Sequence, residues 1–107
     1  MWWARRSLAG VRRSLRLAPL QDVAVDPPPA LPGRAFRGVR FVLRRQPSTC
    51  LQRALVLQAW HAAQGSPREV VIGVSGSTGS FAAHAWLDGD PGDPGRGFDE
   101  LFRLPAR

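Results

Sequence analysis

A run of prolines between residues 22 and 33 sets the strongest limit on how this chain can fold. Four of these twelve residues are proline, in the order Asp-Val-Ala-Val-Asp-Pro-Pro-Pro-Ala-Leu-Pro-Gly. Proline fixes φ and has no amide donor, so a helix cannot continue through this segment and the polyproline conformation is favoured. The sequence therefore predicts an extended linker, which we interpret as a plain spacer rather than as a ligand for an SH3-type domain.

Before this linker, residues 1–21 are predicted to form a basic amphipathic helix. Ala4, Leu8, Val11 and Leu15 recur at helical spacing, and arginines occupy the other faces. Such a helix could dock on a partner or on an anionic membrane surface. It could equally pack its apolar stripe on the rest of the chain, which is the commoner arrangement, and the sequence leaves both possibilities open.

After the linker, residues 34–107 are long enough for one small domain. Residues 34–45 have the pattern of a short helix with a basic face, and Pro47 ends it. The segment begins directly after Gly33, the glycine that follows the last proline of the linker. We therefore expect the folded domain to start with this helix.

A second helix of the domain is predicted to begin just after Ser48 and Thr49, whose side-chain oxygens can cap its N-terminus. It should run to about Gln64 and stop at Gly65. Its predicted apolar face consists of Leu51, Ala54, Leu55, Ala59 and Ala62.

Two strand-like segments follow this helix. Residues 70–74 are a β-branched run, and residues 81–87 form a second apolar segment after a Gly/Ser/Thr turn at 76–80. The two segments should pair as an antiparallel hairpin. The expected fold class is therefore α+β, with a helix packed on a small antiparallel sheet.

The only cysteine, Cys50, lies where the turn becomes the second helix. A thiol attacks as the thiolate, and the free amides at a helix N-terminus stabilise negative charge on that thiolate and on an oxyanion. This position suits a nucleophile, although a small buried side chain would fit it as well. One cysteine cannot form an internal disulfide, so we expect a reducing compartment and a cytoplasmic protein.

Two histidines could act as a base for Cys50. His61 lies eleven residues further along the same helix, about 16 Å away at 1.5 Å per residue, and cannot reach the thiol. His84 lies in the second strand-like segment, and packing of the hairpin on the helix N-terminus would bring it to the thiol. We therefore predict His84 as the base, although a single strand histidine more often has a structural role.

A carboxylate should orient the His84 ring. If residues 88–89, Asp-Gly, form a two-residue turn, the returning strand places Asp93 directly opposite His84. Asp93 is therefore the predicted third residue. The prolines and glycines of this stretch make that strand poor, so a longer loop that presents Asp99 remains open, with Asp90 a weaker alternative.

Charge is divided unequally along the chain. Residues 1–53 carry eleven Arg and two Asp, a net charge of +9, whereas residues 54–107 carry four Arg and six acidic residues, a net charge of −2. This division predicts a basic surface for an acidic partner, which could be a peptide, a nucleic acid or a membrane surface.

Several classes of protein are disfavoured by the sequence. There is no zinc-finger or RNA-recognition pattern and no tyrosine for base stacking, so we expect no nucleic-acid partner. One cysteine and two histidines do not make a zinc site, and we expect no metal and no other cofactor. No apolar run reaches the roughly 18–20 residues of a transmembrane segment, and we expect no signal peptide.

The motifs around Cys50 and His84 resemble a known family. Cys50-Leu51-Gln52-Arg53, a helix, Val71-Ile72-Gly73-Val74 and then His84-Ala85-Trp86 follow one another along residues 34–105. In this order, the Cys-Leu-x-Arg and His-Ala-Trp motifs resemble the protease part of lasso-peptide biosynthesis protein B, a transglutaminase-like cysteine peptidase.

This resemblance implies a transglutaminase/papain-like core with a catalytic triad of Cys50, His84 and a following Asp. The third position does not map cleanly, because Asp93 lies nine residues and Asp99 fifteen residues beyond His84, on either side of the family's usual spacing. A shortened turn would favour Asp93. Acyl transfer by the same triad, or a non-enzymatic basic binding module, remains an alternative.

The resemblance also implies a reaction and its partners. The reaction is removal of the N-terminal leader from a ribosomally synthesised precursor peptide, before a partner ATP-dependent cyclase closes the macrolactam ring. The chain is short for a recognition domain in addition to the protease. It therefore resembles the split form, in which a separate leader-binding protein delivers the precursor.

Overall fold

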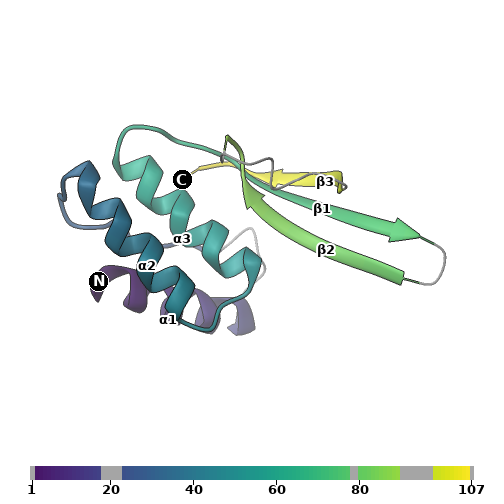
Figure 1. Ribbon diagram of the computed structural model, residues 1–107, viewed down its shortest axis with the longest axis horizontal. Coiled ribbons are helices and arrows are strands. Elements are labelled where there is room, and N and C mark those ends of the chain that lie inside the picture. The colour runs from purple at the N-terminus through teal and green to yellow at the C-terminus, as the bar shows by residue number, and fades with distance from the viewer. Residues whose placement is uncertain (1, 18–22, 78–79, 90–97, 107) are drawn as a thin grey trace.

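The computed structural model describes residues 2–17, 23–77, 80–89 and 98–106. The elements follow in the order α1 (Trp2–Leu17), the 3-10 turn η2 (Gly33–Ala35), α2 (Phe36–Arg45), α3 (Cys50–Ala63), β1 (Val70–Ser77), β2 (Ser80–Leu87) and β3 (Asp99–Leu104). The three helices gather at one end of the molecule, and the β1–β2 hairpin extends away from them (Figure 1). The predicted α+β fold class is confirmed.

Helix α3 begins and ends where the sequence predicts. Thr49 is its N-cap, and a capping box joins Thr49 and Gln52: the Gln52 amide donates to Thr49 Oγ1 at 3.2 Å and the Thr49 amide donates to Gln52 Oε1 at 3.0 Å. Gly65, just after the helix, has a φ of 82°, in the left-handed region that glycine occupies without strain. Local signals alone therefore define this helix.

Helix α1 packs into the common core. Its buried side chains include Ala4, Leu8 and Val11, as the helical pattern indicates, and also Trp3. The Trp3 ring lies 6.1 Å from the ring of Trp60 on α3. The buried stripe of α1 is thus covered by the rest of the chain, while the faces that carry its arginines are available to a partner.

The buried face of α3 differs in part from the predicted one. Ala54 and Leu55 are buried as expected, but Val56 and Trp60 are buried too. The rings of Trp60 and Phe36 stack with their centroids 6.1 Å apart. Because α3 contacts α1 on one side and β2 on another, it buries more of its circumference than a surface helix does.

The proline-rich segment is extended, but it is packed on the helices and is not a free spacer. Val23 is buried, and the Trp3 indole donates a hydrogen bond to the Asp26 carbonyl at 3.0 Å. At the other end, the Gln64 side chain donates to the Leu31 carbonyl at 3.2 Å. The segment is therefore fastened to α1 and to the end of α3.

The sheet has the strand order β2-β1-β3, and both pairs are antiparallel. The β1–β2 pairing confirms the predicted hairpin. β3, however, pairs with β1 and not with β2, so the two-residue hairpin register that placed a returning strand opposite His84 is not found in the described residues. A register shift between Ile72 and Gly73 interrupts the β1–β3 ladder.

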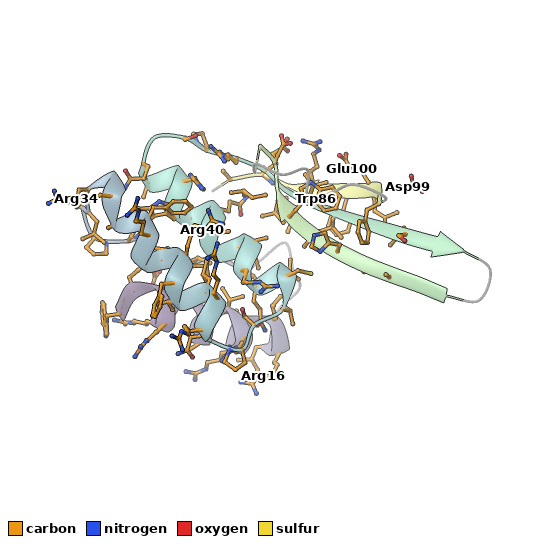
Figure 2. All side chains as sticks on the ribbon, in the orientation of Figure 1. Arg16, Arg34, Arg40, Trp86, Asp99 and Glu100 are labelled. Carbon is orange, nitrogen blue, oxygen red and sulfur yellow. The ribbon has the colours of Figure 1, made fainter. Side chains whose placement is uncertain are left out.

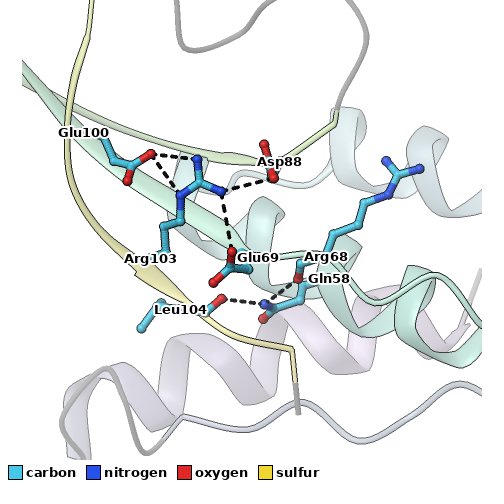
Figure 3. A network of polar contacts seen from close by, with 7 residues as sticks. All are labelled: Gln58, Arg68, Glu69, Asp88, Glu100, Arg103 and Leu104. Carbon is cyan, nitrogen blue, oxygen red and sulfur yellow. Dashed lines mark hydrogen bonds and ion pairs between the residues drawn. The ribbon is translucent and has the colours of Figure 1, made fainter.

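One buried amide ties the helical half to the sheet. The Gln58 side chain, on α3, donates to the carbonyls of Arg68 and Leu104, both at 2.9 Å (Figure 3). These carbonyls lie at the approach to β1 and at the end of β3. A single side chain therefore satisfies two strand ends and fixes their position against α3.

An arginine joins the outer strand to the turn that follows β2. Arg103, on β3, lies within 2.8 Å of Glu100, 3.1 Å of Asp88 and 3.5 Å of Glu69 (Figure 3). All of these side chains are partly exposed. The guanidinium therefore holds three carboxylates from three parts of the sheet around one positive charge.

The helices and the sheet carry opposite charge. The three helices and η2 contain eleven arginines and no acidic residue, whereas Glu69, Asp88, Asp99 and Glu100 all lie in or beside the sheet. Figure 2 shows Arg16, Arg34 and Arg40 on the helical half and Asp99 and Glu100 at the sheet. Within the described ranges, no helix is long and apolar enough to span a bilayer.

Candidate active site

Cys50 is the first residue of α3, directly after the N-cap Thr49. The side chain is half-buried. The capping box uses the amide of Gln52, while the Cys50 and Leu51 amides have no hydrogen-bond partner within the described residues. The thiol therefore lies at the positive end of a helix dipole, where these two amides can stabilise an oxyanion.

His84 lies in the middle of β2, opposite Gly73 of β1. Its ring stacks on that of Trp86 with the centroids 5.7 Å apart, and the Phe98 ring is 5.1 Å away. The two aromatic rings are 6.3 Å from each other. The imidazole is thus one member of a three-ring cluster that limits its rotation.

A small pocket at the contact between α3 and β2 is lined by both Cys50 and His84. Its volume is about 170 Å³. The N-terminus of α3 lies beside the β2 edge of the sheet (Figure 1). The other lining residues, mostly apolar, are Arg53, Ala54, Leu57, Ala85, Trp86 and Leu87.

The structure does not supply an acid for His84 from the described residues. Asp93 and the weaker candidate Asp90 lie outside them. Asp99 is the first residue of β3 and pairs with Val74, whereas His84 pairs with Gly73, the preceding residue of β1. Because neighbouring residues of a strand point to opposite faces, the register places the Asp99 and His84 side chains on opposite faces of the sheet.

His61 lies in the last turn of α3, far along the helix from Cys50. Its ring makes an edge contact with Phe36, with the centroids 5.2 Å apart. The histidine therefore belongs to the packing between α2 and α3, and the expectation that it does not serve the thiol agrees with its position.

Trp86 and Phe98 were not predicted as parts of the site. The alternation of side chains along a strand could have indicated Trp86, because it lies two residues from His84 and residues two apart share a face of the sheet. Phe98 comes to the ring only through the pairing of β3, which the sequence pattern does not define. No group of three or more metal-ligating side chains occurs among the described residues.

Comparison with known proteins gives one family. The model of the family described as the transglutaminase-like superfamily matches residues 1–100, nearly the whole chain. No curated protein and no solved structure matches the chain. The match begins at the first residue, so it includes α1 and the proline-rich segment as well as the α3–β2 site.

Proposed function

The chain belongs to the transglutaminase-like superfamily, and on this premise we propose that it is a cysteine peptidase that removes the leader from a ribosomally synthesised precursor of the lasso-peptide type. The superfamily supports cysteine-peptidase or acyl-transfer chemistry. The choice of leader cleavage rests on the resemblance of the Cys-Leu-x-Arg and His-Ala-Trp motifs to the lasso-peptide protease.

The observation that carries the proposal is the shared pocket of Cys50 and His84. The two residues are separated by a helix and a strand in the sequence, yet they line one hollow of about 170 Å³. A thiol at a helix N-terminus with an imidazole beside it is the arrangement that thiol catalysis requires. The apolar walls of the pocket suit a substrate residue next to the scissile bond.

In the proposed reaction, His84 takes the proton of the Cys50 thiol, and the sulfur attacks the carbonyl carbon of the scissile peptide bond. The Cys50 and Leu51 amides stabilise the resulting oxyanion. The C–N bond then breaks as the His84 imidazolium gives its proton to the leaving amine, which leaves a thioester on Cys50. Water, deprotonated by His84, attacks the thioester, so that the leader carboxylate and the thiol are released.

Asp93 is the proposed third residue, which orients the imidazole and stabilises its protonated form. Asp99 is the alternative. The placement of Asp99 on the other face of β3 argues for Asp93, because a carboxylate must share the face of His84 to accept its ring N–H. Replacement of each acid by Asn in turn tests this choice, and the larger loss of kcat identifies the third residue.

The proposed partners are the precursor peptide, a separate leader-binding protein that delivers it, and an ATP-dependent cyclase that acts on the cleaved product. The arginines of the helical half, a region without acidic side chains in its helices, support an acidic partner. They do not distinguish among the three, and each interaction requires its own binding measurement.

The test is mass spectrometry of a precursor peptide from the same gene neighbourhood, incubated with its leader-binding partner and with the wild-type chain, Cys50→Ala, His84→Gln or His61→Gln. We expect one cut with the wild type and with His61→Gln and none with the other two variants. His61→Gln is the matched control, because it changes the other histidine of the chain. Cutting by Cys50→Ala would overturn the proposed nucleophile.

Acyl transfer is the second candidate, since the family match supports it equally. Its signature is the incorporation of a primary amine at a glutamine side chain with release of ammonia. The same reaction mixtures with an added fluorescent amine distinguish the two. Label incorporation without a new N-terminus would replace the peptidase proposal.

A further inference from the structure

A groove of about 710 Å³ lies between α1 and the proline-rich segment, away from the Cys50 pocket. One wall is formed by an exposed stripe of α1 in which Trp2, Arg6, Gly10 and Arg13 follow one another at helical spacing. The other wall is formed by residues 24–29. Both walls are fastened to each other by the hydrogen bond from the Trp3 indole to the Asp26 carbonyl.

The two arginines of the groove can bind a ligand. Within the described residues, neither Arg6 nor Arg13 forms an ion pair with a carboxylate. The Arg6 guanidinium lies over the Trp2 ring, 5.1 Å from its centroid, so it is held in position before any ligand arrives. The two arginines are seven residues apart on one helix face, which places them about 10 Å apart along the axis.

Gly10 forms the floor of the groove between these arginines. A glycine inside a helix costs about 0.5–1 kcal/mol relative to alanine. Nothing within the described residues requires it, because a Cβ at position 10 would meet no atom within 4 Å. The missing side chain instead leaves room for an external backbone to approach the helix closely.

The opposite wall selects an extended ligand. Pro27, Pro28 and Pro29 present carbonyl acceptors but no amide donors. An extended peptide has free amides that can donate to these carbonyls, whereas a helix uses most of its amides internally. The wall therefore fits a peptide backbone in the extended conformation.

We propose that the groove binds an extended acidic peptide segment with two carboxylates three residues apart. In the extended polyproline II conformation, three residues make one full turn and cover about 9 Å, so both carboxylates lie on the same side at a separation that matches Arg6 and Arg13. Asp26 lies on the proline-rich wall and is exposed. Its charge directs the ligand carboxylates to the α1 wall. This inference does not depend on the chemistry at Cys50.

The test is fluorescence anisotropy with the full chain and a labelled, alanine-rich peptide of ten residues whose two aspartates are three residues apart, here called the spaced peptide. We expect replacement of both aspartates by asparagine to weaken binding at least tenfold, because two charge-assisted contacts are lost. A peptide with adjacent aspartates has the same charge but the wrong spacing, and it should bind several times more weakly. Binding by the wild type that ignores the spacing would overturn the proposal.

Variants of the chain complete the test. Arg6→Gln and Arg13→Gln should each weaken binding about tenfold, while Arg37→Gln, which removes a charge from α2 outside the groove, should change it less than twofold. Gly10→Leu should abolish binding and keep the circular dichroism of the wild type, because it fills the floor of the groove and favours the helix. Gly10→Ala is the smaller filler and should weaken binding severalfold.

A single-stranded oligonucleotide of ten thymidines separates a peptide site from a general polyanion surface. We expect it to bind more weakly than the spaced peptide at near-physiological salt and to be insensitive to Gly10→Leu. Tighter binding of the oligonucleotide, or binding of the spaced peptide that survives Gly10→Leu, would show that the groove is not the peptide site.

Discussion

The Trp86 indole lies directly over Gly73 of the neighbouring strand. A Cβ added at position 73 would lie 2.9 Å from the Trp86 ring and 2.8 Å from the backbone oxygen of Asp99. Glycine is therefore required at the point where β1 meets both the ring from β2 and the backbone of β3. This contact also fixes the ring that stacks on His84.

Gly73→Ala should destabilise the fold by about 1–3 kcal/mol, because the added methyl meets a backbone atom that cannot move away without disturbing β3. Urea unfolding measures the change. Gly10→Ala is the matched control: its methyl meets nothing within 4 Å, and it should stabilise the chain by about 0.5–1 kcal/mol. Equal effects of the two substitutions would contradict the tight contact.

Trp86 is expected to act as a positioning residue for His84. Trp86→Leu removes the stacked ring and should lower kcat by about tenfold to a hundredfold with little change in KM, because the imidazole loses its orientation. Trp86→Phe retains a ring at this position and should recover most of the activity. If Leu and Phe variants had the same kcat, the role of Trp86 would be packing alone.

Ser48 and Thr49, the two hydroxyl residues before Cys50, allow a matched pair of substitutions. Thr49→Ala removes the capping box and should cost about 1 kcal/mol in the free energy of unfolding. The Ser48 Oγ is buried and has no partner within the described residues. Ser48→Ala should therefore be neutral or slightly stabilising. Alkylation of Cys50 should be slower in Thr49→Ala than in the wild type. An unchanged rate would show that the capping box does not influence the reactivity of the thiol.

The Arg103 network predicts a pH dependence. The pKa of Glu100 lies below its ordinary value, chiefly because the Arg103 hydrogen bond favours the carboxylate; partial desolvation and the charge of Asp88 oppose this, and the positive charge of Arg103 adds to it. Because the folded-state pKa is the lower one, the stabilisation is complete at neutral pH and is lost as the pH falls through the range where Glu100 takes up its proton.

The Arg103→Gln variant tests this assignment. NMR titration of the Glu100 carboxyl should show its pKa rising toward the ordinary value, and the acid limb of the stability profile should flatten. Arg37→Gln is the comparison, because it removes one positive charge from α2, away from the network. A Glu100 titration that Arg103→Gln leaves unchanged would contradict the network.

Local signals allowed α3 and the β1–β2 hairpin to be predicted from the sequence. The cap at Thr49, the stop at Gly65 and the turn between the strands each act over a few residues, so their effect can be recognised in the residue order alone. The same holds for the placement of Cys50 at the helix N-terminus.

Long-range contacts explain what the sequence did not reveal. The pairing of β3 with β1 depends on the register shift at Ile72–Gly73 and on the Gln58 contact, neither of which has a local pattern. The docking of the proline-rich segment involves hydrogen bonds from Trp3 and Gln64, which are distant from it in the sequence. The predicted hairpin register that led to the choice of Asp93 is not found among the described residues, because β3 pairs with β1 and not with β2. Asp93 stays a prediction.

The division of charge between helices and sheet gives the molecule an electric dipole moment. The field of this dipole would act on a negatively charged partner before contact and orient the molecule so that its helices face the partner. Association should therefore be fast and should slow steeply with added salt, while dissociation changes little. The encounter would begin at the arginines, and the thiol at the junction with the sheet would come within reach only in a second step.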